Sequence, residues 1–245
     1  MMQRKNLLRR AALPALVPCL AFSMAFGSAQ AQWLGKPGQR DVAVGAAAHL
    51  TFDARGNGVR QKTDPSLGAL VSFHSSYQWS RGFVLNYGYT RVNEDMQGDG
   101  NNPYGTDFAP SSSGIANRHE FTAAYLVKGP KLFWGLRPFG EAGGGALLFL
   151  PSSGHFEKYH HIQVENTNTQ TIEDLTYSET LDVSSQTRAA GLFGAGLDWA
   201  LDRHWGGRLE YRALAFVAPS FQQWDFNSRA YTLSQAPTLS LYYKF

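Results

Sequence analysis

The feature that most constrains this chain is a strict alternation of side-chain character with a period of two, repeated in segments of about ten residues. The clearest case is the C-terminus, where Leu239, Leu241, Tyr243 and Phe245 alternate with Thr238, Ser240, Tyr242 and Lys244. Successive side chains of a β-strand point to opposite faces, so the pattern indicates strands with one apolar and one polar face. The sequence therefore predicts an all-β fold.

The spacing of these segments predicts how the strands are joined. Eight segments begin near Asp41, Ser66, Gly82, His119, Leu136, Thr187, Gly207 and Arg229. The links are short near Trp79, Pro130 and His204, and long at 53–65, 93–118, 151–186 and 217–228. Short periplasmic turns that alternate with long external loops are typical of outer-membrane barrels, and a sheet in lipid must close because open edges leave unpaired backbone groups in hydrocarbon. We therefore predict an eight-stranded antiparallel up-and-down transmembrane β-barrel over 40–245.

The first 31 residues have the composition of an export signal. A basic start, with Arg4, Lys5, Arg9 and Arg10, precedes an apolar stretch, and small residues follow at Ala29 and Ala31. We predict a cleaved signal peptide over 1–31 and a short periplasmic segment over 32–39. The whole chain has a formal charge of +3, and four basic residues leave with the signal, so the remainder carries −1. We therefore expect no nucleic-acid partner.

Tryptophans mark the predicted short turns. Trp79, Trp134, Trp199 and Trp205 all lie at these turns, and amphipathic rings collect where a membrane meets water. We interpret these four residues as a periplasmic aromatic girdle, the alternative being ordinary core aromatics of a soluble β-protein. Further aromatic residues lie toward the opposite strand ends: Tyr89, Phe121, Phe216 and Tyr231.

Charged side chains fall on the face that would line the barrel. Eight strands leave an interior just wide enough for side chains to fill, and a buried charge is costly unless it is paired. We predict a salt-bridge network in the lumen formed by Arg137, Glu141, Asp198, Arg208, Glu210 and Arg212. Further polar residues on the same face are His49, His74, Asn86, Glu120 and Lys128. Such a network would plug the barrel; a narrow ion path is the alternative.

Three segments carry a resemblance to a known family: Arg137–Ala146, Gly194–Trp199 and Arg208–Arg212. They resemble the small eight-stranded outer-membrane barrels, which include OmpA-like transmembrane domains and opacity-type surface proteins. The chain ends in a segment that looks like the family's outer-membrane insertion signal, with Leu241, Tyr243 and Phe245 as its apolar positions. The resemblance implies an outer-membrane location, contact with outer-membrane lipid and recognition by the insertion machinery. It implies little about activity, because the family has structural, adhesive and enzymatic members.

The sequence contains only weak candidates for catalytic or ligand-binding motifs. Gly143–Gly145 lie in a strand pattern and lack the Lys-Ser/Thr of a phosphate loop, so we interpret them as a means of curvature. The histidines near His160 lack the spacing of a metal site, and Cys19 falls in the predicted signal peptide, so we expect no metal and no cofactor. His74 and Ser76 share the inward face without an evident acid partner, which disfavours a lipid-modifying enzyme.

The long polar loops are the most distinctive part of the chain. Alternating threonines over 167–176 indicate a hairpin arm whose exposed edge can pair with another strand. We expect a monomeric, non-enzymatic barrel with a structural or surface-adhesive role, which meets an extracellular ligand through 93–118 and 151–186. A narrow ion or small-solute channel is the first alternative, and a lipid-modifying enzyme is the second.

Overall fold

The architecture comes from a computed structural model, which describes residues 39–56, 59–78, 80–98, 111–152, 155–166, 171–221 and 230–245. The predicted signal peptide, nearly all of 32–39 and Trp79 lie outside these residues, as do the side chains of 161–175. No helix within the described ranges is both long and apolar enough to cross a membrane.

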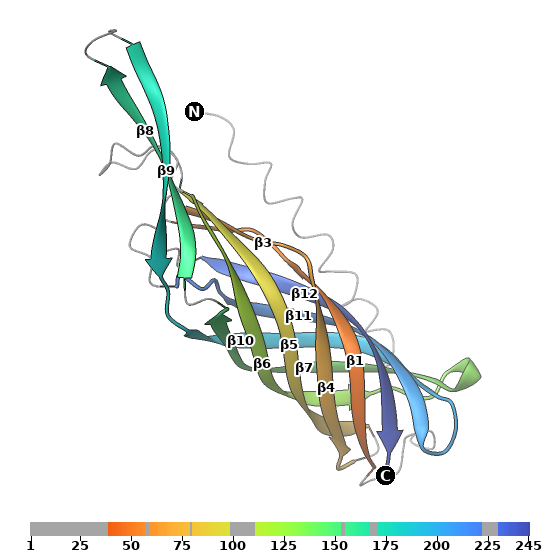
Figure 1. Cartoon of the computed structure of the whole chain (residues 1–245). Coiled ribbons are helices and arrows are strands. Elements are labelled where there is room, and N and C mark those ends of the chain that lie inside the picture. Colours follow the sequence, from red (N-terminus) through yellow and green to blue (C-terminus); the bar gives the residue numbers. More distant parts are fainter. Residues whose placement is uncertain are drawn as a thin grey trace, which may run out of the picture.

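Eight strands form a closed antiparallel ring, which confirms the predicted barrel (Figure 1). They are β1 (Arg40–Thr51), β4 (Ser66–Ser76), β5 (Arg81–Gly98), β6 (Ser111–Lys128), β7 (Leu136–Pro151), β10 (Gln186–Ala200), β11 (Trp205–Val217) and β12 (Tyr231–Lys244). Each strand pairs with the next, and β1 pairs with both β4 and β12. Closure leaves no open edge around the ring, as hydrocarbon requires.

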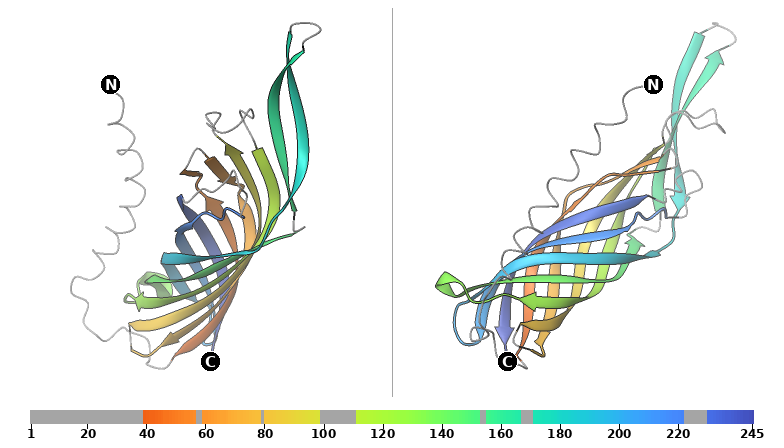
Figure 2. Two further views of the ribbon diagram at one scale, coloured as in Figure 1. Left: turned by 90° about the vertical axis from the view of Figure 1, so that its left-hand side faces the viewer. Right: turned by 180° about the vertical axis from the view of Figure 1, so that it is seen from behind.

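Four further strands lie beyond the ring, in segments that the sequence predicted as long loops. β2 (Ala54–Gly56) and β3 (Val59–Thr63) extend the sheet beside the upper part of β5. β8 (His155–Asn166) and β9 (Thr171–Asp182) form a hairpin, here called the arm, which stands clear of the barrel (Figure 2). A hairpin arm was predicted in this region, and the structure extends it over both β8 and β9.

The predicted loop 93–118 is wrong in its bounds. β5 continues to Gly98 and β6 starts at Ser111 rather than near His119, with Gln97 paired to Ser111. These strand ends rise above the apolar part of the sheet, where both faces contact water or protein. Their side chains therefore need no apolar alternation, which is why the sequence pattern missed them.

The short turns all lie at one end of the barrel, together with the C-terminus (Figure 1). They span 77–80, 129–135 and 201–204, and the second contains a 3₁₀ turn at Phe133–Gly135. The strand ends that border the long connections lie at the other end, together with the arm. Following the topology of outer-membrane barrels, we call the short-turn end periplasmic and the other end extracellular.

The barrel wall has two chemically different faces. On β5 the outward positions between Arg81 and Arg91 are Phe83, Leu85, Tyr87 and Tyr89. Across all eight barrel strands, the charged residues at outward positions are Arg40, Arg81, Arg91 and Asp95. The first two lie at the periplasmic end and the last two above the apolar part of β5, so a continuous apolar band surrounds the barrel. Inward positions, by contrast, hold buried charges.

Candidate functional site

The lumen holds two groups of charged side chains, one above the other. The periplasmic charge cluster comprises Asp41, His74, Lys128, Asp198 and Arg208, which come from five different strands and are all buried. Arg208 lies at its centre: Nε donates to Asp198 Oδ1 at 2.6 Å and Nη2 to Asp41 Oδ1 at 3.1 Å. Lys128 Nζ donates to Asp198 Oδ2 at 3.1 Å. Two cations and two carboxylates thus balance one another.

Arg208 also sets the hydrogen-bonding role of His74. Arg208 Nη1 lies 2.9 Å from His74 Nε2, and a guanidinium is only a donor, so that ring nitrogen acts as the acceptor. The Arg208 guanidinium lies 5.5 Å from the centre of the Phe139 ring and 5.1 Å from that of Tyr242. His74 therefore serves an ion-pair cluster inside the barrel and does not face lipid.

The central charge cluster comprises Glu120, Glu141, Glu210 and Arg212, and it is not balanced. Arg212 Nη2 donates to Glu120 Oε1 at 2.5 Å, and Nε lies 3.6 Å from one oxygen each of Glu141 and Glu210. All four side chains are at least 97% buried. Within the described part of the chain, neither oxygen of Glu141 accepts a hydrogen bond. One guanidinium therefore serves three carboxylates, only one of them at hydrogen-bond distance.

A glycine makes room for this arrangement. Gly194 on β10 pairs with Glu141 on one side and Arg212 on the other. A Cβ at Gly194 would lie 2.7 Å from Glu141 Cγ, which is too close for ordinary contact. The missing side chain lets Glu141 lean across β10 toward Arg212.

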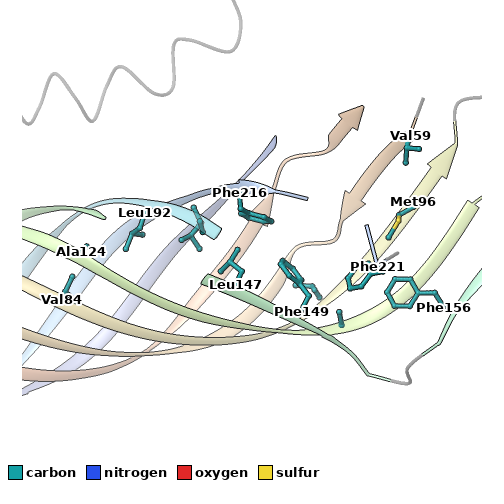
Figure 3. Close-up of a cluster of buried hydrophobic side chains, with 14 residues drawn as sticks. Val59, Val84, Met96, Ala124, Leu147, Phe149, Phe156, Leu192, Phe216 and Phe221 are labelled. Carbon is teal, nitrogen blue, oxygen red and sulfur yellow. The ribbon is translucent and has the colours of Figure 1, made fainter. Parts of the chain in front are cut away.

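Nearer the extracellular end, the lumen changes character. Arg118 Nη2 donates to His49 Nδ1 at 2.5 Å on one side of the barrel. Beside these polar groups, a cluster of buried hydrophobic side chains runs toward the extracellular end (Figure 3). Its four phenylalanines, here called the aromatic plug, are Phe149, Phe156, Phe216 and Phe221. Ring centres lie 4.9 Å apart for Phe156 and Phe221, and 6.0 Å apart for Phe149 and Phe216.

The loop after β11 brings Phe221 into the aromatic plug. Phe221 has a φ of 50°, in the left-handed region that non-glycine residues rarely adopt, and its side chain is completely buried. The neighbouring Ser220 N–H donates to Gln186 Oε1 at 3.1 Å, and Arg188 Nη2 donates to the same oxygen at 2.7 Å. Burial of a large ring and these hydrogen bonds hold residues 218–221 at this end of the barrel.

Most of the predicted lumen residues meet one another. Asp198 and Arg208 lie in the periplasmic charge cluster, whereas Glu141, Glu210 and Arg212 lie in the central one. Arg137 lies at the periplasmic end of β7, where its Nε donates to the Gly129 carbonyl oxygen at 3.0 Å. Its membership of one network with the others stays a prediction. Among the further polar residues, His49, His74, Asn86, Glu120 and Lys128 are all buried.

Sequence reasoning missed two important partners. Asp41 is the second residue of β1, at the periplasmic end of the strand. It was not among the residues predicted to line the lumen, yet it pairs with Arg208. Arg118 fell in the supposed loop 93–118, although it shares the parity of Glu120 on β6. Extending the alternation of β6 by one step toward its N-terminus would have placed Arg118 inside the barrel.

The described tryptophans lie at the periplasmic end. Trp134 is 88% exposed in the 3₁₀ turn, Trp199 faces outward near the end of β10, and Trp205 packs edge-on against Tyr243 with ring centres 5.1 Å apart. Their action as a girdle stays a prediction. Phe216 differs from the other aromatics at the opposite strand ends, because it points inward. It pairs with Thr232 of β12 and has inward parity with Arg212, which the sequence interpretation overlooked.

The predicted insertion residues lie on the outer surface. Leu241 and Tyr243 face outward from β12, and Phe245 follows the strand end in an exposed position. Their recognition by insertion machinery stays a prediction.

The arm carries paired charges across its two strands. His155 Nδ1 lies 2.8 Å from Asp182 Oδ1, and His160 Nε2 lies 3.2 Å from Glu179 Oε1. Lys158 Nζ approaches the same Glu179 oxygen at 3.9 Å. The base of the arm is attached to the barrel by pairing of β8 with Ser111–Ser113 of β6, and by Phe156 in the aromatic plug. In the described part of the chain, no group of three or more acidic, histidine or cysteine residues is arranged to hold a metal ion.

A closed antiparallel ring, an apolar exterior band and a charged interior together define an integral membrane β-barrel. The protein is therefore an outer-membrane β-barrel protein in its fold and in the chemistry of its two faces.

Comparison with known proteins gives neighbours among solved structures only. No protein-family model and no curated protein sequence matches the chain. The chain is similar to Ail, the attachment invasion locus protein of Yersinia pestis, with 12% identity and a TM-score of 0.44 over 86% of this chain and all of that one. It is also similar to OprG of Pseudomonas aeruginosa, with 13% identity and a TM-score of 0.44 over 87% of this chain and 98% of that one. Neisserial surface protein A has 12% identity and a TM-score of 0.43, over 85% and 99% of the two chains.

Proposed function

We propose that this protein is a non-enzymatic surface barrel with a plugged lumen, whose structural or adhesive role is carried by its extracellular segments. The observation that carries the proposal is the way the lumen is filled. Two charge clusters and the aromatic plug follow one another from the periplasmic to the extracellular end, with residues that are almost completely buried. A filled lumen leaves the loops and the arm as the part that meets other molecules.

Single-channel recording in a planar bilayer tests the plugged lumen. The refolded mature protein should give a silent bilayer, with heat-modifiable gel mobility as the control that the barrel has folded. Reproducible conductance steps from folded protein would overturn the proposal.

A narrow cation path is the second candidate, and the excess of carboxylates in the central charge cluster favours it. In that cluster the carboxylates of Glu120, Glu141 and Glu210 share a single cation, Arg212, among the described ion pairs. A conducting barrel with this interior would select cations over anions. Cation selectivity would appear as a reversal potential of the corresponding sign in a KCl gradient. Glu141→Gln should reduce the size of that potential.

The enzymatic alternative has less support. A lipid-modifying enzyme of this architecture needs histidine and serine on the lipid-facing surface. His74 is 1% exposed and lies against Arg208 inside the barrel. Incubation of the folded protein with outer-membrane lipid, followed by mass spectrometry of the lipid, should return unmodified lipid.

A further inference from the structure

We propose that the outer edge of β9 binds an extended segment of another protein by strand addition, and that the segment carries two basic residues three positions apart, one on each face of the sheet. The inference rests on the proposed surface role and names the partner that the arm would take. It follows from the hydrogen-bonding groups left at this edge, from the charge of β9 and from the position of the arm.

The edge is long and regular. Tyr177–Asp182 pair residue by residue with His160–His155 of β8, and β9 is the last strand of the sheet. In the described part of the chain, no other strand pairs with Tyr177–Asp182. An edge strand exposes a row of N–H and C=O groups that matches an incoming strand, and proteins normally protect such edges with proline, lysine or a bulge. The sequence of β9 contains neither proline nor lysine.

The charges of β9 select the partner. Glu179 and Asp182 are acidic, with side chains 47% and 93% exposed, and β9 contains no arginine either. β8 shows what complements these residues, because it presents His155 to Asp182, and Lys158 and His160 to Glu179. A strand on the open side of β9 would meet the same two carboxylates. Glu179 and Asp182 lie three positions apart and therefore point to opposite faces of the sheet. Two basic residues three positions apart on the incoming strand therefore complement both carboxylates, since opposite charges across neighbouring strands stabilise the pair.

The same charges disfavour a second copy of β9 as the occupant. Two β9 edges brought together would present only carboxylates to one another among their charged residues, and like charges across strands are destabilising. The arm also stands away from the barrel on the extracellular side, where another protein can approach it (Figure 2).

A peptide with the β8 sequence His155–Asn166 is the direct probe, since β8 is the strand already known to complement β9. Fluorescence anisotropy would be measured with the labelled peptide and the refolded mature protein in detergent micelles. We expect saturable binding that is lost when residues 155–182 are replaced by a short linker. A scrambled peptide of the same composition should bind at least tenfold more weakly.

Two backbone-methylated peptides separate strand addition from simple charge attraction. One is N-methylated at every even-numbered residue and the other at every odd-numbered residue, so each loses its N–H donors along one edge only. Strand addition predicts that one of the two binds like the unmodified peptide and the other at least tenfold more weakly. Equal binding of both peptides, or no binding of the unmodified peptide, would overturn the proposal.

The protein alone provides the last control. Sedimentation should give a monomeric barrel at all concentrations tested, and dimers that disappear on removal of the arm would assign the edge to a second copy instead. Failure of peptide binding with a silent bilayer would reject strand addition and leave the plugged surface barrel intact. Conductance steps would reject the plugged barrel whatever the peptide does.

Discussion

At the scale of single residues, Arg212 is the side chain on which the central charge cluster depends. It is completely buried and is the only cation within reach of Glu120, Glu141 and Glu210 among the described ion pairs. Removing one partner of a buried ion pair costs more than the pair contributes, because the other charge stays buried without compensation.

Arg212→Ala should therefore lower the free energy of unfolding by about 3–5 kcal/mol, whereas Lys244→Ala should cost less than about 1 kcal/mol. Lys244 lies at the strand end, where its ammonium sits 4.8 Å from the centre of the Tyr242 ring. Urea unfolding of both variants in detergent, followed by tryptophan fluorescence, compares them directly. Equal midpoints for the two variants would contradict the ion-pair assignment.

The buried carboxyl group of Glu94 leads to a second prediction at the scale of single residues, on how stability depends on pH. It follows the last apolar outward residue of β5 by five positions and lies among the polar neighbours Asn93 and Asp95, outside the membrane-spanning part. Burial raises the pKa of Glu94 from 4.5 to about 7, although Gln61 and Thr63 donate hydrogen bonds to its Oε2. Between these two pH values the unfolded chain releases a proton that the folded protein keeps, so stability falls as pH rises from 4.5 to 7.

The loss amounts to roughly 3 kcal/mol at about 1.4 kcal/mol for each pKa unit. Glu94→Gln cannot ionise, so the fall in urea midpoint between pH 5 and pH 8 should shrink relative to the wild type. Asp53→Asn removes an exposed carboxylate paired with Arg60 and serves as the control. An unchanged pH dependence in Glu94→Gln would show that the Glu94 site does not retain its proton.

At the scale of elements, the close approach of β6 and β7 depends on glycine. Gly145 faces inward on β7, and a Cβ there would overlap the backbone of Phe121 and Thr122 on β6. Gly191 on β10 pairs with Gly144, but a Cβ at Gly191 would find its nearest neighbour 3.9 Å away. The two glycines therefore have different tolerance for a methyl group.

Gly145→Ala should lower stability by about 1–3 kcal/mol through overpacking, and Gly191→Ala should be close to neutral. Heat-modifiable gel mobility measures the folded fraction of both variants after refolding, and urea midpoints measure their stability. If Gly191→Ala were as damaging as Gly145→Ala, the cause would be chain flexibility and not the approach of β6 to β7.

At the scale of the whole molecule, the ring and the arm are separable. Closure uses β1, β4, β5, β6, β7, β10, β11 and β12, whereas the arm contacts the ring through Ser111–Ser113 and Phe156. Replacing residues 155–182 by a short linker should leave heat-modifiable mobility intact. The free energy of unfolding should fall by no more than the burial of one phenylalanine, about 3 kcal/mol. A protein that fails to fold without the arm would show that the arm takes part in closing the barrel.

The sequence by itself determined the parts of this protein that depend on local alternation. A period of two assigns inward and outward faces within any one strand, so the apolar exterior, the buried positions of Glu141, Asp198, Arg208, Glu210 and Arg212, and the eight barrel strands followed from the sequence alone. The alternation fails where both faces of a strand meet water or protein. For that reason the upper ends of β5 and β6 were mistaken for loop, whereas Arg118 keeps the inward parity of Glu120 and lies one residue before the predicted start of that strand.

Only the tertiary structure decided which charges meet. Arg208 pairs with Asp41 across 167 positions of sequence, and Arg212 with Glu120 across 92. Such contacts depend on the register of every strand between them and on how the ring closes, because a small shift in register moves a side chain along the lumen away from its partner. The period-two alternation predicts that a residue faces inward. Closure of the barrel sets the height in the lumen at which the residue lies and the charge that it meets there.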